Sequence, residues 1–131
     1  DLARFAASSM VVVMGGLQPG QSTNAVAALA AETIRADLLV NATDVDGVYT
    51  ADPHKDSRAR KLDEVTPEEL ETILVREGFG AGEYALMDPL ALRIIRRSHI
   101  PVTIVDGRDP STIEKALQGK RIGTRVVSVE R

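Results

Sequence analysis

The sequence predicts an α/β fold, a three-layer αβα sandwich built on a mostly parallel sheet. Two observations predict it. Short apolar runs alternate along the chain with segments in which apolar residues recur at helical spacing. The loops after the apolar runs are rich in Gly, Asp and Thr. Such loops gather at the carboxyl ends of the strands in α/β sheets, where ligands bind.

The first strand–helix–strand unit is expected from residues 10–43. Residues 10–14 form a continuous apolar run, which predicts a strand buried on both faces. Residues 24–35 are apolar all round and predict a packed helix, and residues 36–43 predict a second buried strand. Strands joined in this way are parallel, with a right-handed crossover. Residues 1–9 predict the end of a helix that leads into the first strand.

A long polar loop is predicted over residues 44–65, which are rich in Asp, Gly, Pro and charge. It is longer than a plain turn, and long ordered loops are commonly functional. Thr66 then predicts the start of a helix, because Pro67 follows it and Glu69 completes a capping box. This helix is expected to end near Gly78.

The rest of the chain predicts two helices and two strands. Two Asp-Pro pairs mark the helix starts, since Asp is a preferred N-cap and Pro suits the first helical position. In order, the elements are a helix from Asp88 to about His99, a strand over residues 100–107, a short helix from Asp109 to near Gly119, and an edge strand over residues 123–129.

Composition limits the possible functions. The length of 131 residues suits one domain, residues 1–131, with an aliphatic core, since 44% of residues are hydrophobic and 3% aromatic. A net charge of −3 without a long basic run argues against nucleic acid as the main partner. The absence of cysteine excludes disulfides and thiolate chemistry, and it fits a cytoplasmic protein. No apolar run approaches the ~18 residues of a membrane helix.

The glycine loop in VVVMGGLQPGQSTNAVAALAAE has two interpretations. Gly15, Gly16 and Gly20 allow a ligand to approach the backbone closely. Ser22 and Thr23 lie just before a helix, whose N-terminus favours an anion. The same residues fit an ordinary βα turn with Ser or Thr as N-cap. The loop alone does not decide between a phosphate cradle and a turn.

The stretch NATDVDGVYTADP, residues 41–53, is the second candidate. Thr43 at a strand end could meet a base or a phosphate, and Tyr49 could lie against a purine ring. Asp44, Asp46 and Asp52 could accept hydrogen bonds or reach Mg²⁺ through water. Each acid taken singly fits a turn residue better, because Asp-Gly and Asp-Pro punctuate chains for local reasons.

Asp88 also has two interpretations. Spacing alone favours an N-cap in front of Pro89, whereas a functional acid would point from the helix start toward the ligand edge. His54 and His99 lack a metal-ligand partner at helical spacing and are expected to be structural or solvated. Arg93, Arg96 and Arg97 belong to the helix predicted to begin at Asp88, and they indicate a solvated face of that helix.

Together these stretches resemble the amino acid kinase superfamily, and within it the UMP kinases of the archaeal type. The resemblance covers essentially the whole chain and rests on VVVMGGLQPGQSTNAVAALAAE, ADLLVNATDVDGVYTADP, KLDEVTPEEL and MDPLALRIIRRSHIPVTIVDG. It implies a transferase of pyrimidine nucleotide biosynthesis that moves the γ-phosphoryl of ATP to UMP, with Mg²⁺. It also implies a cytoplasmic homo-oligomer, commonly a hexamer, and residues 1–131 as the C-terminal, ATP-binding part of a longer kinase.

The resemblance further implies roles for single residues. Thr43, Tyr49 and Asp52 would bind ATP. Asp88 would help to organise the transferring phosphate and its magnesium, and Asn24 stands at the catalytic position where these kinases usually carry Asp. No residue is implied to be a direct metal ligand. The UMP-binding residues would be Leu17, Gln18, Pro19, Gly20, Gln21, Ser22 and Thr23.

Two departures from the family pattern keep other hypotheses open. Asn24 cannot contribute a carboxylate charge. The lysine that neutralises phosphate charge in the family belongs to its N-terminal half, and Lys61 and the other lysines here are expected away from the site. Both departures favour an alternative, a catalytically impaired nucleotide-binding or regulatory module. A phospho-accepting receiver domain is a third hypothesis, but no acidic pair lies on an early strand.

Overall fold

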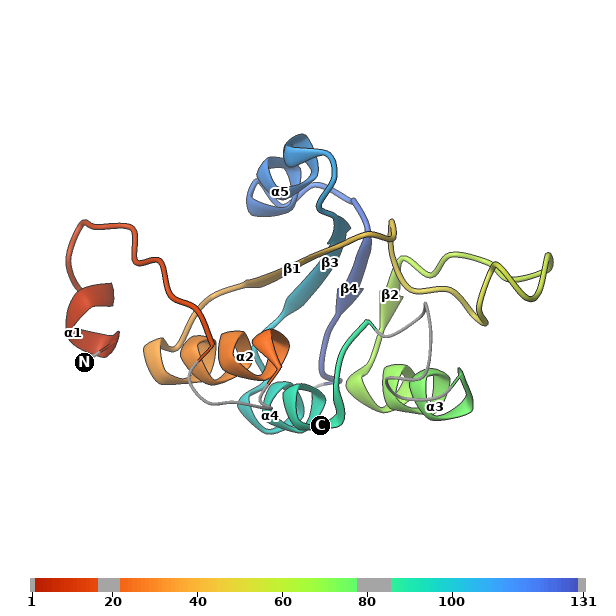
Figure 1. The fold of residues 1–131 in the computed structure, drawn as a ribbon, viewed down its shortest axis with the longest axis horizontal. Coiled ribbons are helices and arrows are strands. Elements are labelled where there is room, and N and C mark those ends of the chain that lie inside the picture. Colours follow the sequence, from red (N-terminus) through yellow and green to blue (C-terminus); the bar gives the residue numbers. More distant parts are fainter. Residues whose placement is uncertain (1, 17–21, 78–85, 130–131) are drawn as a thin grey trace.

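The computed structural model describes residues 2–16, 22–77 and 86–129 (Figure 1). Nine elements form within these residues. They are α1 (Leu2–Ala6), α2 (Thr23–Ile34), β1 (Leu39–Thr43), β2 (Glu64–Val65), α3 (Pro67–Glu77), α4 (Pro89–Ser98), β3 (Val102–Asp106), α5 (Pro110–Leu117) and β4 (Thr124–Val126).

The four strands form one sheet in the order β1-β3-β4-β2. β1 pairs with β3 in parallel, with Leu39 opposite Val102 and Thr43 opposite Asp106. β4 is antiparallel to β3 and parallel to β2. Helices α2, α3 and α4 lie on one side of the sheet and α5 on the other (Figure 1). The predicted α/β class, with a mostly parallel sheet between helical layers, is confirmed.

The helix starts follow the predicted capping chemistry. In α3, the Glu69 carboxylate accepts from the Thr66 N–H at 2.8 Å and the Thr66 hydroxyl accepts from the Glu69 N–H at 3.1 Å, which is the predicted capping box. Asp88 caps α4 and Asp109 caps α5. Local sequence therefore fixes where these helices begin.

The core lies between the sheet and the α2–α4 layer. The buried face of α4 consists of Ala91, Leu92, Ile94 and Ile95. Its exposed face carries arginines, as predicted, and Arg97 forms an ion pair with Glu32 of α2 at 2.6 Å. No helix that the structure describes combines the length and the apolar character needed to cross a membrane.

The strand predicted over residues 10–14 does not form. These residues are irregular, and Val11 and Val13 are 91% and 90% exposed. A buried strand needs hydrogen-bonded neighbours, and none of the described strands pairs with this segment. Its apolar run indicates a preference for burial but does not specify which partner supplies it.

The sheet edges also differ from the prediction. β4 was expected at an edge, but it lies between β3 and β2. β2, two residues long, was assigned to a loop because so short a strand leaves no period in the sequence. The two edges are β1 and β2, and the edge position of β1 explains why its residues are partly exposed where full burial was expected.

Candidate active site

The candidate site lies where β1 and β3 end and where α2 and α4 begin. Thr43 and Asp106, the last residues of the two parallel strands, are register partners. Helices α2 and α4 each precede one of these strands and return along the same side of the sheet, so both helices begin at the carboxyl-end edge (Figure 1). This edge is where α/β proteins bind their ligands.

Ser22 and Asp88 join the two helix N-termini. They are 66 residues apart, and the Ser22 hydroxyl donates to Oδ2 of Asp88. Ser22 Oγ also accepts from the Ala25 N–H at 3.1 Å, and Asp88 Oδ1 accepts from the Ala91 N–H at 2.8 Å. Asp88 is therefore an N-cap, as spacing favoured, and it also faces the start of α2. Two positive helix ends converge on one carboxylate.

Asn24 and Asn41 lie beside this pair. The Asn24 amide donates to the Leu86 carbonyl at 3.3 Å, and the Asn41 amide donates to the same carbonyl at 3.2 Å. Sequence reasoning singled out Asn24 but missed Asn41, because an Asn within a strand has no distinguishing local pattern. The one available signal was that Asn is depleted in strands.

Thr43 closes a tight turn at the end of β1. Its hydroxyl accepts from the Val45 N–H at 3.0 Å and donates to the Val45 carbonyl at 3.1 Å. The Thr43 carbonyl accepts from the Gly107 N–H at 2.7 Å, which binds the two loop starts together. A Cβ on Gly107 would lie 2.9 Å from that of Ala42, so only glycine allows this approach.

Tyr49 is held within the same loop. Its hydroxyl donates to both carboxylate oxygens of Asp46, at 2.9 and 3.2 Å. This hydrogen bond, together with partial desolvation, raises the pKa of Tyr49 above its ordinary value. The ring is thus fixed over the loop by a local contact, in the region where an ATP contact is expected.

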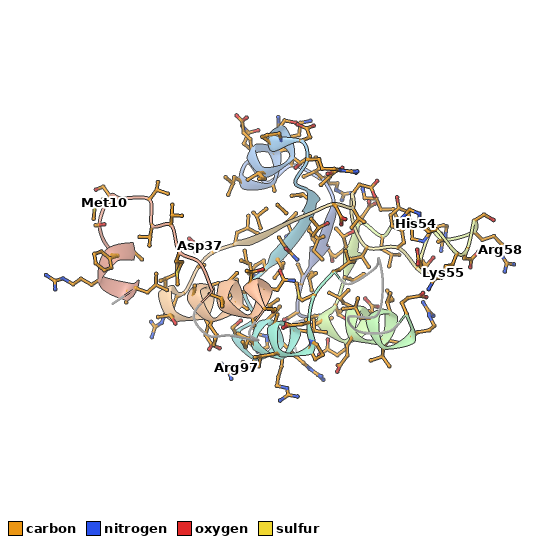
Figure 2. All side chains as sticks on the ribbon, viewed as in Figure 1. Met10, Asp37, His54, Lys55, Arg58 and Arg97 are labelled. Carbon is orange, nitrogen blue, oxygen red and sulfur yellow. The ribbon has the colours of Figure 1, made fainter. Side chains whose placement is uncertain are left out.

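Asp52 is the most buried of the acids in this loop, at 4% exposure. Its Oδ1 accepts from the His54 N–H at 2.9 Å, and Lys55 lies 3.9 Å from Oδ2. The residue lines a surface hollow of about 430 Å³ that also borders Arg76 of α3. Figure 2 shows His54, Lys55 and Arg58 at the tip of the loop, away from the sheet.

Arg108 supplies a cation at the strand ends. Its guanidinium donates to both oxygens of Asp106, at 2.9 and 2.7 Å, and these hydrogen bonds lower the pKa of Asp106 to about 2. Asp106 contributes most to the raised pKa of Arg108, and the more distant charges of Asp44 and Asp46 add to it. Three acids, Asp106, Asp44 and Asp46, therefore act on the guanidinium of Arg108.

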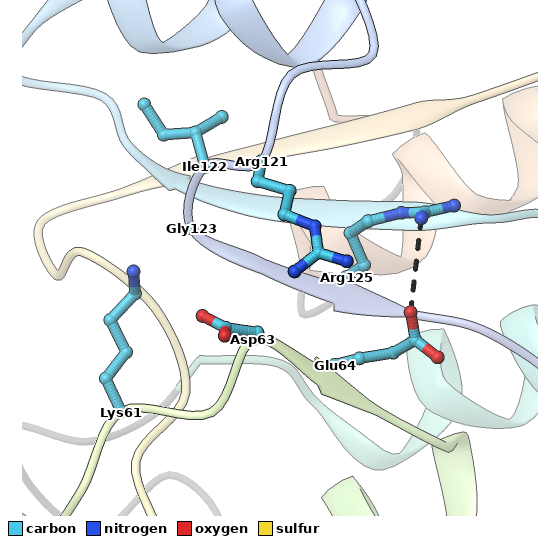
Figure 3. Close-up of a pocket in the computed structure, with 7 residues that line it drawn as sticks. All are labelled: Lys61, Asp63, Glu64, Arg121, Ile122, Gly123 and Arg125. Atoms are coloured by element: carbon cyan, nitrogen blue, oxygen red, sulfur yellow. Dashed lines mark ion pairs between the residues drawn. The ribbon is translucent and has the colours of Figure 1, made fainter.

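Lys61 lies closer to Tyr49, a predicted ATP-binding residue, than expected. The backbones of Lys61 and Tyr49 form an isolated antiparallel β-bridge. The Cε atom of Lys61 would lie 2.9 Å from a Cβ built on Gly47. The side chain lines a hollow of about 290 Å³ with Arg121, Arg125 and Asp63 (Figure 3). None of the residues that line this hollow is a predicted site residue.

The structure thus brings together part of the predicted site. Ser22, Asn24 and Asp88 gather at the starts of α2 and α4, while Thr43 ends β1 and contacts Val45 and Gly107. Tyr49 and Asp52 lie farther along the loop, each engaged in local hydrogen bonds. Of the seven residues predicted to bind UMP, Ser22 and Thr23 are described, while Leu17, Gln18, Pro19, Gly20 and Gln21 lie outside the described residues.

Magnesium fits this arrangement only as a companion of a phosphate ligand. Among the described residues, no three acidic or histidine side chains gather as a metal cage. A carboxylate has about four lone-pair sites. Asp88 uses one on Ser22 and one on Ala91, so it can still accept from a ligand or a hydrated cation.

The sequence profile of the amino acid kinase family matches residues 1–106. The chain belongs to the amino acid kinase family. It is 49% identical over 117 residues to the uridylate kinase of Methanocella arvoryzae, which covers 89% of this chain and 52% of that protein. It is 48% identical over 125 residues to the uridylate kinase of Sulfolobus acidocaldarius, covering 95% and 55%. The chain spans about half the length of the relatives that it matches.

Solved structures give the same relationship. The crystal structure of the uridylate kinase from Archaeoglobus fulgidus is similar with a TM-score of 0.75 and 45% identity, covering 87% of this chain and 50% of that one. Aspartokinase III of E. coli, in complex with aspartate and ADP, is similar with a TM-score of 0.61 and 31% identity, covering 82% and 21%. The fold is therefore that of a family of phosphotransferases.

Proposed function

We propose that this chain carries the donor-nucleotide side of a UMP kinase. Such an enzyme transfers the γ-phosphoryl of ATP to UMP and releases UDP and ADP. Thr43, Tyr49 and Asp52 are assigned to ATP, Asp88 and Asn24 to the transferring phosphate, and residues 17–23 to UMP. The proposal places residues 1–131 in the C-terminal part of a cytoplasmic, oligomeric kinase.

The contact between Ser22 and Asp88 carries this proposal. It brings the starts of α2 and α4 to one point at the carboxyl-end edge, so that the positive ends of two helix dipoles face the same space. Helix N-termini of this kind bind phosphate. The similarity to uridylate kinases at 45% identity or more supports UMP as the acceptor of the phosphoryl group. The ADP complex of the aspartokinase supports a nucleotide as its donor.

The residues of this chain would bind and orient rather than form covalent intermediates. An oxygen of the UMP phosphate bonds to the γ-phosphorus while the bond from that phosphorus to the bridging oxygen of ADP breaks. Transfer of this kind needs alignment and charge stabilisation. Magnesium bound to the ATP phosphates would neutralise developing charge. Asp88 would hold that hydrated cation in place, and the N–H groups of α2 and α4 would face the phosphate oxygens.

A nucleotide-binding module without transfer activity is the second candidate. Asn24 favours it, because the amide carries no charge and already donates to the Leu86 carbonyl. An impaired module would bind ATP and leave UMP unphosphorylated. The two candidates differ in turnover and not in ATP affinity.

Calorimetric titration with Mg·ATP and, separately, with UMP tests the proposal, alongside an assay of UDP formation. Mg·ATP binding with equal release of UDP and ADP would support the kinase. Mg·ATP binding with no UDP at saturating UMP would favour the impaired module. Failure to bind Mg·ATP, in a chain whose circular dichroism shows cooperative unfolding, would contradict both.

A further inference from the structure

The two asparagines of the chain meet at one backbone carbonyl. Asn24 and Asn41 are its only asparagines. One belongs to the first turn of α2 and the other to the middle of β1. Their side-chain amides donate to the Leu86 oxygen at 3.3 and 3.2 Å. A carbonyl oxygen has two lone pairs, so these two donors saturate it.

This carbonyl belongs to the segment that delivers Asp88 to its position. Leu86 and Met87 are both 4% exposed, so the segment is buried on the way to α4. Asp88 follows in an extended conformation, with φ −84° and ψ 162°, and its carboxylate accepts from Ser22. Fixing the Leu86 carbonyl from two sides therefore fixes the peptide two residues before the carboxylate.

We propose that Asn24 and Asn41 act together as positioning residues, forming an amide clamp on Leu86 that aims the Asp88 carboxylate at the start of α2. The clamp ties three elements, α2, β1 and α4, at the point where they converge. Its consequence for phosphoryl transfer rests on the proposed function. The clamp itself is a statement about hydrogen bonds and is testable without turnover.

The clamp explains why an amide, and not a carboxylate, suits position 24. A carboxylate at position 24 or 41 would bring an acceptor against an acceptor, since an ionised acid has no proton to donate to the Leu86 oxygen. In this chain Asn24→Asp is therefore expected to weaken the site rather than to restore an activity. The impaired-module hypothesis predicts the opposite, because there the missing charge is the defect.

The direct test is NMR on the full chain labelled with ¹⁵N-asparagine and ¹³C′-leucine. With two asparagines, the spectrum contains two side-chain amide groups to assign. We expect a coupling through the hydrogen bond from each amide to the Leu86 carbonyl carbon. Absence of both couplings in the unmodified chain would overturn the clamp, whatever the variants do.

Asn41→Asp and Asn24→Asp test the positioning role. Each is expected to remove one coupling and to shift the carboxyl ¹³C signal of Asp88. Gln118→Glu is the matched control, since it makes the same amide-to-acid change at the exposed C-cap of α5 and should leave both signals unchanged. An unchanged Asp88 signal in Asn41→Asp would show that the clamp does not aim the carboxylate.

UDP formation then separates this inference from the proposed function. We expect Asn41→Asp to lower kcat at least about tenfold, with KM for ATP within about twofold, because misplacement of a catalytic group costs rate more than binding. A chain with both couplings but no turnover would contradict the kinase and leave the clamp standing. Couplings with an unchanged kcat in Asn41→Asp would contradict the positioning role alone.

Discussion

Asp88 and Asp109 each belong to an Asp-Pro pair at the start of a helix, but their surroundings in the fold differ. Each precedes a proline and caps a helix, and each accepts from a backbone N–H just downstream, that of Ala91 and that of Ser111. Asp88 is partly buried and also accepts from Ser22, 66 residues away. Asp109 is exposed, and its hydrogen bonds with Ser111 and Thr112 stay within its own turn.

The difference teaches that an Asp-Pro pair specifies a helix start and nothing more. Function requires the second contact, which depends on where the sheet places the start of another helix. The pair also provides an internal control, because the same substitution at Asp109 repeats the local change without the distant one. Other residue pairs of this chain offer the same contrast between local and long-range contacts.

The largest effect is expected from Asp88→Asn compared with Asp109→Asn. Asn is as good an N-cap as Asp, so both helices should persist. Removing the charge at Asp88 is expected to lower kcat for UDP formation about 10²- to 10³-fold, the usual cost of losing one stabilising group at a transferring centre. Asp109→Asn should change kcat less than about twofold, since surface substitutions are near neutral.

The measurement is steady-state UDP formation with both variants at matched concentration. Circular dichroism checks that helix content is unchanged. Equal rates in the two variants would mean that Asp88 is no more than a cap, and the distinction between the two Asp-Pro pairs would then have no functional content.

Gly123 and Gly119 repeat the contrast in stability. Both have positive φ, +62° and +75°, so Ala costs about 1 kcal/mol at either position for the left-handed backbone. A Cβ on Gly123 would also lie 1.8 Å from the Ile104 carbonyl oxygen, whereas one on Gly119 meets nothing within 4 Å. We expect Gly123→Ala to lose about 3 kcal/mol and Gly119→Ala about 1 kcal/mol in urea unfolding. Similar losses would show that β3 and β4 can separate at this point.

Thr124 and Thr112 are two buried threonines with the same contrast. The Thr124 hydroxyl accepts from the Val48 N–H at 2.8 Å, 76 residues away, and donates to the Leu62 carbonyl. The Thr112 hydroxyl donates only to nearby carbonyls, those of Asp106 and Asp109, six and three residues earlier in the chain. Thr124→Val leaves a buried N–H without a partner and should cost about 2 kcal/mol, against about 1 kcal/mol for Thr112→Val.

The measurement is the midpoint of urea unfolding for both valine variants. In Thr124→Val, hydrogen exchange at the Val48 amide should also accelerate, since this bond holds the loop after β1 to β4. A slow Val48 amide in that variant would indicate another partner for the loop and would contradict the assignment.

The sequence predicted the helices better than the sheet. Helix starts depend on contacts within one turn, such as that between Thr66 and Glu69, so their signatures lie in adjacent letters. Strand pairing joins distant segments, which is why residues 10–14 were wrongly assigned and β4 was placed at an edge. The candidate site divides in the same way: resemblance pointed to Asp88 and Asn24, but Asn41 became visible only once β1 was placed beside Leu86.

Arg108→Ala is expected to have the smallest effect, and it sharpens the comparison of acids. Hydrogen bonds from Arg108 hold the pKa of Asp106 at about 2 instead of 3.8. A depressed folded-state pKa means that this pair stabilises the fold above pH 3.8 and that the stabilisation disappears as pH falls through about 2.

In Arg108→Ala, the midpoint of Asp106 in a carboxyl ¹³C titration should rise toward 3.8. The pKa of Asp109, lowered chiefly by its hydrogen bonds with Ser111, should stay low in the same spectra. If the titration midpoints of Asp106 and Asp109 rose together, the charge of Arg108 would act on both carboxylates. The hydrogen-bonded pair of Arg108 and Asp106 would then not explain the low pKa of Asp106 by itself.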